Sequence, residues 1–322
     1  MRTINLVIGC DGTWNEPEQL SNGQPAPTNV AKFLSAMASV RKTQRRHYEQ
    51  GVGTRAWEPL AGGIYGYGLE KRILGAYRFL RKEFAQIDRA AFAVKIFLIG
   101  FSRGAYTARR IAGLLAHSGV PVKASDTHVG FEVYQNRDTA SAAQMKEAGR
   151  FFDVPVEMVG VWDTVKSTND ADFHDHDLSA NVVAGYHAMA IDEHRRFFPA
   201  LEWNADPRAL QVWFAGVHSD VGGGYSDARL SDVALRWMIF RALDHGLQFK
   251  ASHVNQKLNP SPIAPMHDSF TGIWPPFGSA SRLIGATDWI HESVEARSAD
   301  DAEYHPANLP ADPNYWQAVT NA

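Results

Sequence analysis

The chain has 322 residues, of which 45% are hydrophobic and 21% charged, and a formal net charge of -3, so it is neither disordered nor positive enough to attract nucleic acid. Cys10 is its only cysteine, which excludes an intramolecular disulfide and a cysteine-based zinc cluster. No apolar run is long enough for a membrane-spanning helix, and the first residues lack a signal-peptide pattern. We therefore expect a cytoplasmic protein with at most peripheral membrane contact.

Strands and helices are predicted to alternate along the first three quarters of the chain. The expected strands are 3–10, 47–52, 93–99, 154–162 and 210–217, and the expected helices are 28–41, 69–84, 104–117 and 230–243. This alternation predicts an α/β fold with a mainly parallel central sheet and helices on both faces.

Glycine and proline mark the segments that are expected to be irregular. The glycine-rich stretch 51–68 is predicted to be a loop, and the prolines at 259–276 and 306–313 indicate irregular structure near the C-terminus. We expect one domain over 1–322, with a core at about 3–245 and a C-terminal segment at about 246–322 that wraps it.

The clearest motif for chemistry is Gly100-Phe-Ser-Arg-Gly104. It lies between a predicted buried strand and a predicted helix, which is the context of the nucleophile elbow of α/β-hydrolases. The two glycines leave room for a sharp turn that holds Ser102 above the sheet, and the backbone N–H of Arg103 is the expected first donor of an oxyanion hole. Ser102 is therefore the candidate nucleophile.

A serine nucleophile needs a histidine to accept its proton and a carboxylate to orient that histidine. His218 is the best of thirteen histidines, because it follows a predicted strand and opens the glycine-rich segment His218-Ser-Asp-Val-Gly-Gly-Gly-Tyr225. His267 is the reserve candidate. His117, His187, His245 and His291 are weaker candidates, since they lie in or beside sequence that is typical of helices.

Asp163 is the candidate acid, because it ends a predicted strand and lies between Ser102 and His218 in the chain order of α/β-hydrolases. Asp192 and Asp220 are the alternatives, and Asp220 is more typical of a residue that shapes the loop beside His218. The segment Asp11-Gly-Thr-Trp-Asn15 after the first strand is the expected source of the second oxyanion donor, from Gly12 or Thr13.

Four ordered motifs, over most of residues 3–240, resemble a known family. They are Asp11-Gly-Thr-Trp-Asn15, Gly100-Phe-Ser-Arg-Gly-Ala-Tyr-Thr-Ala-Arg109, Val161-Trp-Asp-Thr-Val165 and Trp213-Phe-Ala-Gly-Val-His-Ser-Asp-Val-Gly-Gly-Gly-Tyr225. They resemble the α/β-hydrolase family whose best-known members are phospholipase effectors of bacterial type VI secretion systems. The resemblance implies a triad of Ser102, Asp163 and His218, and lipid ester hydrolysis.

Three alternatives compete with a serine esterase. A metal-assisted esterase or phosphoesterase would use Asp11, His218 and Asp220 as ligands, although a complete set of organic catalytic groups predicts no metal and no cofactor. A phosphatase with an aspartyl nucleophile two residues before Asp-Gly-Thr is disfavoured, because Gly9 occupies that position. The third alternative is a binding module that keeps the fold without turnover.

Two further sequence features have competing interpretations. The segment His174-Asp-His-Asp177 is typical of a solvated loop rather than a metal site, because sequence neighbours rarely point at one centre. The segment Ile273-Trp-Pro-Pro-Phe-Gly278 places Trp274 and Phe277 in an irregular loop. These aromatic side chains either lie at a lipid-water boundary or are buried and anchor the C-terminal segment to the core.

Overall fold

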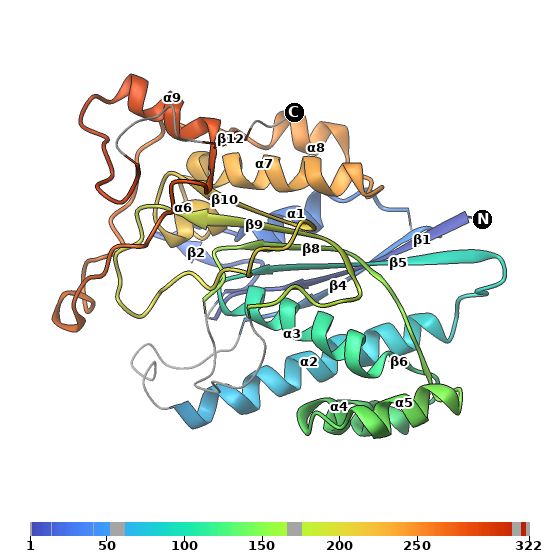
Figure 1. Ribbon diagram of the computed structural model, residues 1–322. Coiled ribbons are helices and arrows are strands. Elements are labelled where there is room, and N and C mark those ends of the chain that lie inside the picture. Colours follow the sequence, from blue (N-terminus) through green and yellow to red (C-terminus); the bar gives the residue numbers. More distant parts are fainter. Residues whose placement is uncertain are drawn as a thin grey trace.

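The computed structural model describes residues 2–13, 15–40, 42–51, 62–165, 176–310 and 317–319, with the backbone alone for 62–67 and 317–319. Within these residues the centre of the molecule is an eight-stranded sheet in which every neighbouring pair of strands is parallel (Figure 1). The strands, in their order across the sheet, are β4 (Gln44–Glu49), β1 (Arg2–Cys10), β5 (Phe92–Phe101), β8 (Val156–Trp162), β9 (Val182–Ala190), β10 (Ala209–Phe214), β11 (Trp289–His291) and β12 (Gln317–Val319).

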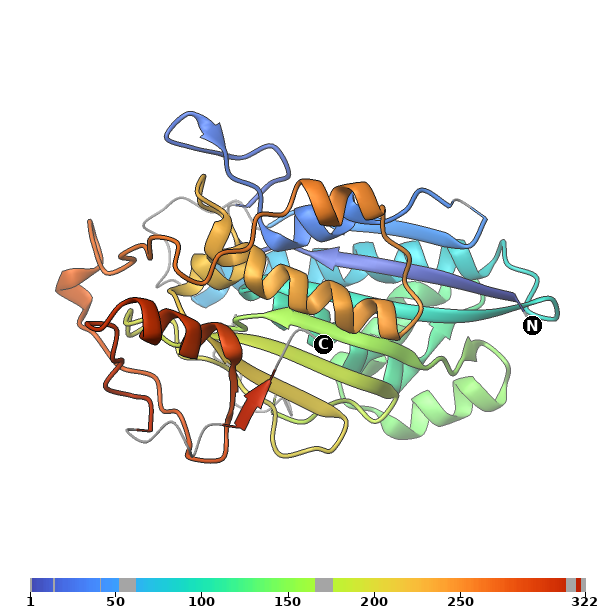
Figure 2. The same ribbon diagram turned by 90° about the horizontal axis from the view of Figure 1, so that it is seen from above.

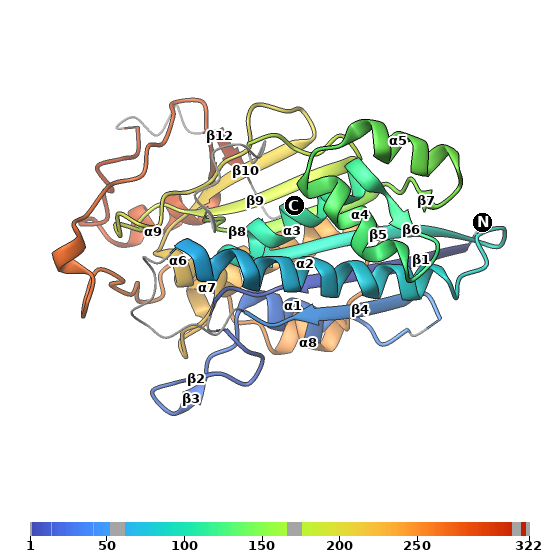
Figure 3. The ribbon, with the colours of Figure 1, turned by 90° about the horizontal axis from the view of Figure 1, so that it is seen from below.

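Helices cover both faces of the sheet, which confirms the predicted α/β architecture. Figure 3 shows one face covered by α2 (Gly62–Phe84), α3 (Arg103–Ser118), α4 (Asp126–Gln135) and α5 (Thr139–Glu147). Figure 2 shows the other face, which is covered by α1 (Asn29–Ala36), α7 (Arg229–Asp244) and α8 (Ala251–Gln256). Two short antiparallel pairs lie outside the main sheet, β2 (Leu20–Ser21) with β3 (Gln24–Pro25), and β6 (Val120–Pro121) with β7 (Phe151–Phe152).

Each face of the sheet has its own apolar core. Leu6, Ile96 and Val159 are buried among the side chains of α2 and α3, whereas Val7 and Phe97 are buried among those of α1 and α7. Because successive side chains of a strand point to opposite faces, a central parallel strand needs apolar residues at every position. This explains the unbroken apolar run at the end of β5. The strand ends at Phe101, directly before the turn at Ser102.

Several element boundaries differ from the predicted ones. The predicted helix at 69–84 begins at Gly62, so 62–68 is helical rather than a loop, and 52–61 lies outside the described residues. The helix α1 is shorter than expected: the side chain of Thr28 caps its first turn, and it ends at Ala36. The strand β9 was not predicted, because its small residues and His187 do not form an apolar alternation.

Small residues in β9 have a packing reason. A Cβ atom on Gly185 would lie 2.9 Å from the side chain of Leu178 and 3.3 Å from that of Trp203, so large neighbours fill the space that the strand leaves. A strand of this kind is indistinguishable from loop or helix by composition alone.

The C-terminal segment is irregular over much of its length, as its prolines predict, yet it also extends the sheet. It contributes β11 and β12, the helix α9 (Glu292–Asp300) and a single turn at Pro275–Phe277. In Figure 1 its orange to red chain lies beside the edge at which the strands end. Among the helices of the described residues, none combines the length and hydrophobicity that a membrane crossing requires.

Candidate active site

Three predicted site residues follow the ends of three strands. Ser102 lies between β5 and α3, Asp163 directly follows β8, and His218 comes four residues after the end of β10. The carboxyl ends of parallel strands lie along one edge of a sheet, which is where such folds place their ligands. The structure brings these three side chains together at that edge.

Ser102 occupies the strained turn that its motif predicts. Its backbone has φ 58° and ψ -127°, and its N–H donates to the carbonyl of Trp162 on the neighbouring strand at 3.0 Å. A Cβ atom on Gly100 would lie 2.6 Å from Ala105 Cα, and one on Gly104 would lie 2.2 Å from the carbonyl oxygen of Cys10. The turn therefore requires glycine on both sides of the serine, because no larger residue fits.

His218 connects the serine with the carboxylate. Its Nε2 lies 2.8 Å from Ser102 Oγ, and its Nδ1 lies 2.5 Å from Asp163 Oδ2. The histidine opens the short helix α6 (His218–Gly222) rather than a loop. The strand β10 before it ends at Phe214, three residues earlier than predicted. The imidazole packs between the rings of Phe101 and Phe198, whose centroids are 4.6 Å and 5.1 Å away.

The electrostatic environment keeps His218 neutral and Asp163 ionised. Burial lowers the pKa of His218, and the hydrogen bond and negative charge of Asp163 offset part of that effect. Burial alone would raise the pKa of Asp163, but the charge of Arg282 and the hydrogen bond with His218 hold it well below its usual value. A neutral imidazole beside an ionised carboxylate is the state in which a histidine accepts a proton from a serine.

Asp163 sits in a turn that its neighbours fix. Its backbone has a positive φ of 40°, and its N–H donates to the carbonyl of Ala188 at 2.7 Å. The N–H of Thr164 donates to Nε2 of the fully buried His187 at 3.0 Å. Burial lowers the pKa of His187 to about 3, so this ring stays neutral and accepts that hydrogen bond. His187 thus supports the acid from a strand and not from a helix.

Arg282, from the C-terminal segment, is part of the same cluster and was not predicted. Its guanidinium is buried and donates hydrogen bonds to both carboxylate oxygens of Asp163, from Nη1 to Oδ1 and from Nη2 to Oδ2 at 2.9 Å. Arg282 follows Asp163 by 119 residues, within an irregular stretch that has no motif. No signal in the sequence could have associated the two residues.

The loop after β1, from which the second oxyanion donor is expected, lies against Ser102. A Cβ atom on Gly12 would lie 3.2 Å from Ser102 Cβ, so the loop passes beside the nucleophile. The N–H of Gly12 donates to Asp11 Oδ1 at 2.8 Å, which leaves Thr13 as the better of the two predicted donors. Arg103 begins α3, and the first N–H groups of a helix have no intrahelical partner.

The carboxylate of Asp11 holds this loop in place through hydrogen bonds within the protein. Its Oδ2 accepts hydrogen bonds from Thr28 Oγ at 2.6 Å and from the Tyr48 hydroxyl at 2.7 Å, while its Oδ1 accepts from Gly12. Burial raises the pKa of Asp11 to about 6 in spite of these three bonds.

The reserve candidates serve other contacts. His267 binds Asp220, with its Nδ1 2.6 Å from Oδ1, and stacks on the ring of Tyr225. Asp220 also accepts from the N–H of Val217, so it shapes the turn before His218. Asp192 accepts from the N–H of Gly216 and from the hydroxyl of Tyr304.

A buried glutamate, which no sequence motif indicated, contacts the backbone of His218. Glu193 accepts hydrogen bonds from the N–H of His218 at 3.2 Å and from the hydroxyl of Ser269 at 3.0 Å. It also forms an ion pair with Arg195, 2.8 Å away. The short segment after β9 therefore positions the backbone of His218.

The proposed metal ligands have protein partners instead. Within the part of the chain that the structure describes, no three His, Cys, Asp or Glu side chains are grouped as a metal ion would need. Of the segment 174–177, His174 and Asp175 lie outside the described residues. His176 contacts the carbonyl of Glu202, and Asp177 accepts from Asn204.

An aromatic group extends from His218 to the surface. It consists of Phe197, Phe198, Trp274 and Phe277, whose rings contact one another, with centroids 5.3 Å apart for Phe198 and Trp274, 6.3 Å for Trp274 and Phe277, and 5.8 Å for Phe197 and Phe277. Phe197 is 48% exposed and Phe277 39%, and the adjacent Ile273 is 55% exposed. Of the two interpretations of this segment, full burial in the core does not hold, because Trp274 is only half-buried and Phe277 is exposed.

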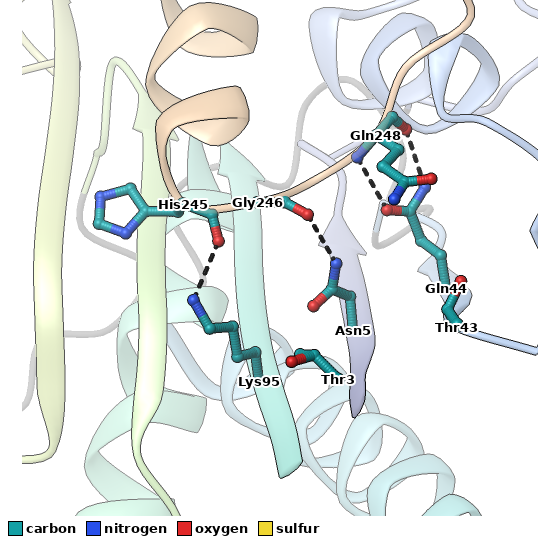
Figure 4. Close-up of a pocket in the computed structure, with 8 residues that line it drawn as sticks. All are labelled: Thr3, Asn5, Thr43, Gln44, Lys95, His245, Gly246 and Gln248. Carbon is teal, nitrogen blue, oxygen red and sulfur yellow. Dashed lines mark hydrogen bonds between the residues drawn. The ribbon is translucent and has the colours of Figure 1, made fainter. Parts of the chain in front are cut away.

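A separate cavity lies at the other end of the strands. It has a volume of about 270 Å³ and is lined near the starts of β1 and β5 by residues including Asn5 and Lys95 (Figure 4). Asn5 donates to the carbonyl of Gly246, and Lys95 donates to that of His245. These polar side chains hold the chain between α7 and α8, and they are far from the cluster at Ser102.

Comparisons with known proteins agree with this fold. An uncharacterized protein of Saccharomyces cerevisiae is 25% identical over 297 residues, which cover 81% of this chain and 41% of that protein. An uncharacterized protein from Pseudomonas aeruginosa has a similar structure, with a TM-score of 0.57 and 19% identity over 80% of this chain and 49% of that one. The chain thus spans less than half the length of either relative.

The structure of the Tle1 effector bound to the VgrG spike of the type VI secretion system is also similar, with a TM-score of 0.50 and 15% identity, over 82% of this chain and 78% of that one. At this identity the likeness concerns the fold alone. The sequence model of one family, however, matches residues 4–241, about three quarters of the chain and all four of its motifs. The chain therefore belongs to the family of Tle1-like catalytic domains of type VI secretion phospholipase effectors.

Proposed function

We propose that this protein is a serine hydrolase that cleaves carboxylic esters of lipids, phospholipids among them, through an acyl-enzyme. The observation that carries the proposal is the continuous chain of hydrogen bonds from Ser102 Oγ through the imidazole of His218 to Asp163. Membership in a family of phospholipase effectors supports lipid as the substrate class.

In the first half of the reaction, His218 Nε2 takes the proton of Ser102 as the oxygen attacks the ester carbonyl. The tetrahedral oxyanion accepts hydrogen bonds from the backbone N–H groups of Arg103 and Thr13. The imidazolium then gives its proton to the leaving alcohol, and an acyl group remains on Ser102. Asp163 stays ionised throughout and stabilises the imidazolium.

In the second half, a water molecule replaces the alcohol. His218 takes a proton from this water as it attacks the acyl carbonyl, and returns the proton to Ser102 Oγ when the fatty acid leaves. Every proton in the cycle passes through Nε2, so the reaction needs no metal ion and no cofactor.

The aromatic group supports a substrate held at a lipid surface. Phe198 packs against His218, and contacts through Trp274 reach the exposed rings of Phe197 and Phe277. Partly exposed aromatic rings are suited to the boundary between lipid and water. We therefore place acyl-chain entry and peripheral membrane contact at this group.

The test is a panel of short-chain esters and phospholipids, with the wild type and Ser102→Ala compared in the presence and absence of a chelator. The proposal predicts release of fatty acid from phospholipid by the wild type, loss of release in Ser102→Ala, and no effect of chelation. Release of a phosphorylated head group, or activity that depends on a divalent ion, would favour the metal-assisted phosphoesterase. A wild type that binds lipid without turnover would make the protein a binding module.

A further inference from the structure

The contact between Arg282 and Asp163 joins the C-terminal segment to the candidate triad. Nη1 donates to Asp163 Oδ1 and to the carbonyl of Ala190 at 2.9 Å, and Nη2 donates to Asp163 Oδ2 and to the carbonyl of Phe198 at 2.8 Å. Asn308 donates to the carbonyl of Arg282 at 3.2 Å and so fixes its backbone. The arginine lies beyond residues 4–241, which the family model matches.

The position of Asp163 creates a need for a nearby cation. Its side chain is fully buried, and an isolated carboxylate without access to water is costly enough that it takes up a proton instead. A protonated Asp163 would carry no negative charge, so it would bind the Nδ1–H of His218 more weakly and would not stabilise the imidazolium. In the structure the buried cation that faces both carboxylate oxygens is Arg282.

The same contact fixes the orientation of the carboxylate. Oδ1 accepts hydrogen bonds from Arg282 and from the N–H of Ala190 at 2.9 Å, and Oδ2 accepts from Arg282 and from His218. The planar guanidinium bonds both oxygens at once, which prevents rotation of the carboxylate. The second acceptor position of Oδ2 therefore faces His218 Nδ1.

We propose that Arg282 is a positioning residue for the hydrolase reaction, holding Asp163 ionised and in the one orientation that directs His218 Nε2 at Ser102. This inference rests on the proposed function. It makes the C-terminal segment a part of the catalytic unit rather than only a cover for it.

Other charged groups around His218 and Asp163 are already paired or neutral. Glu193 and Arg195 form an ion pair on the side of the His218 backbone, and Asp220 pairs with His267. His187, behind Asp163, is neutral because burial lowers its pKa to about 3. The carboxylate of Asp192 accepts a hydrogen bond from Tyr304, and that of Asp11 accepts hydrogen bonds from Thr28 and Tyr48.

Removal of the Arg282 charge has a definite effect on pH dependence. Without the cation, the negative charge of Asp163 favours protonation of the pair that it forms with His218, whichever residue holds the proton. The proton must leave before His218 can act as a base, so the acid limb of kcat/KM moves to higher pH. A purely structural arginine would lower the amount of folded enzyme without moving this limb.

The experiment measures kcat and KM for a soluble short-chain ester across about pH 5 to 9, which spans the range where a histidine base titrates. It compares the wild type with Arg282→Met, Arg282→Lys and Arg297→Met, after thermal unfolding has shown that each variant is folded. Arg297 is the matched control, because it is a buried arginine of the same segment that donates to the carbonyls of Pro262 and Ala264 and does not contact Asp163.

We expect Arg282→Met to lower kcat on the order of 10²-fold, less than the ~10⁴-fold that loss of the acid itself costs, with KM nearly unchanged. Its acid limb should move up by about one pH unit. Arg282→Lys should keep the wild-type limb, because it keeps the charge, and should lose part of kcat, because one ammonium cannot bond both oxygens in the same way. Arg297→Met should keep the wild-type kcat and limb.

A second comparison covers the case in which Arg282→Met does not fold. In Asp163→Asn the carboxylate is absent, so the added change in Asp163→Asn/Arg282→Met should cost little further kcat. Equal kcat and pH limb in Arg282→Met and the wild type, or independent losses in the double variant, would overturn the proposal. Failure of the proposed function itself would differ, since the wild type would then either not hydrolyse the ester or lose its activity on chelation.

Discussion

The sheet core and the C-terminal segment build their parts of the site in different ways. Ser102, Asp163 and His218 are placed by the core, because each follows a strand whose neighbours fix its end. Arg282 belongs to an irregular chain, and single side-chain hydrogen bonds to backbone carbonyls fix its position. The core thus supplies the proposed reacting groups, and the C-terminal segment supplies charge and apolar surface around them.

Substitutions in the core and in the C-terminal segment should therefore have different effects on hydrolysis. A substitution among the reacting groups of the core should remove the chemistry while the fold remains. A substitution of Trp274 or Phe277, which the C-terminal segment contributes to the aromatic group, should change which substrates are accepted, because these side chains lie outside the chain of hydrogen bonds.

The largest expected effect is in the core. Ser102→Ala and His218→Ala should each lower kcat by on the order of 10³-fold or more, and the double variant should be little worse than either one. The reason is that the two groups act as a unit, so removal of one disables the other. Steady-state kinetics on a soluble ester checks this, and independent, additive losses would argue against the shared mechanism.

A smaller effect concerns the loop beside the nucleophile. Because the pKa of Asp11 is raised to about 6, the folded protein holds a proton on Asp11 between about pH 4 and 6 that the unfolded chain has lost. The stability that Asp11 contributes is therefore complete below about pH 4 and declines as the pH rises through 6. The free energy of unfolding of Asp11→Asn, relative to the wild type, should rise over this range by on the order of 3 kcal/mol.

Chemical denaturation at several pH values measures this difference. Asp206→Asn is the control: Asp206 is a half-buried aspartate whose pKa is lowered by its hydrogen bonds with Arg208, so any pH trend should have the opposite sign. A pH-independent difference for Asp11→Asn would mean that Asp11 is ionised in the folded protein.

The smallest expected effect lies in the C-terminal segment. Trp274→Ala should lower hydrolysis of aggregated phospholipid about 10-fold and leave a soluble short-chain ester nearly unaffected, because the ring is half-buried at the surface and not in the core. Stability should change by less than the roughly 3 to 5 kcal/mol of a buried tryptophan. Vesicle and soluble-ester assays on one preparation give both numbers.

Trp289→Ala is the matched control for this comparison. Trp289 is 41% exposed and belongs to β11, where it pairs with Val212 of β10 and with Gln317 of β12. Its removal should change neither assay. Equal losses on both substrates for Trp274→Ala would instead assign that ring a structural role.

The parts of the site that the sheet positions could be predicted from the sequence. The positions of Ser102, Asp163 and His218 could be predicted as one cluster, because each follows a recognisable strand and parallel strands end at one edge. The turn at Ser102 was equally predictable, since its two glycines are in tight contact with backbone atoms. Local pattern was sufficient wherever the sheet itself does the positioning.

Long-range contacts were not predictable in this way. Arg282 and Glu193 reach the site through hydrogen bonds with residues far along the chain or with backbone atoms, and neither lies in a periodic pattern. The loop at Gly12 shows the same limit at close range, because its N–H donates to the adjacent Asp11 and only the folded structure reveals this. Exposure of Phe277 likewise depends on where an irregular chain comes to lie.

Labelling with a fluorophosphonate probe asks whether Ser102 is a nucleophile that His218 activates. We expect the probe to attach to the wild type at Ser102, identified by mass spectrometry of the peptide that contains it. Ser102→Ala should not be labelled, and His218→Ala should be labelled far more slowly. Absence of labelling in a folded wild type, or labelling that persists in Ser102→Ala, would mean that Ser102 is not the nucleophile.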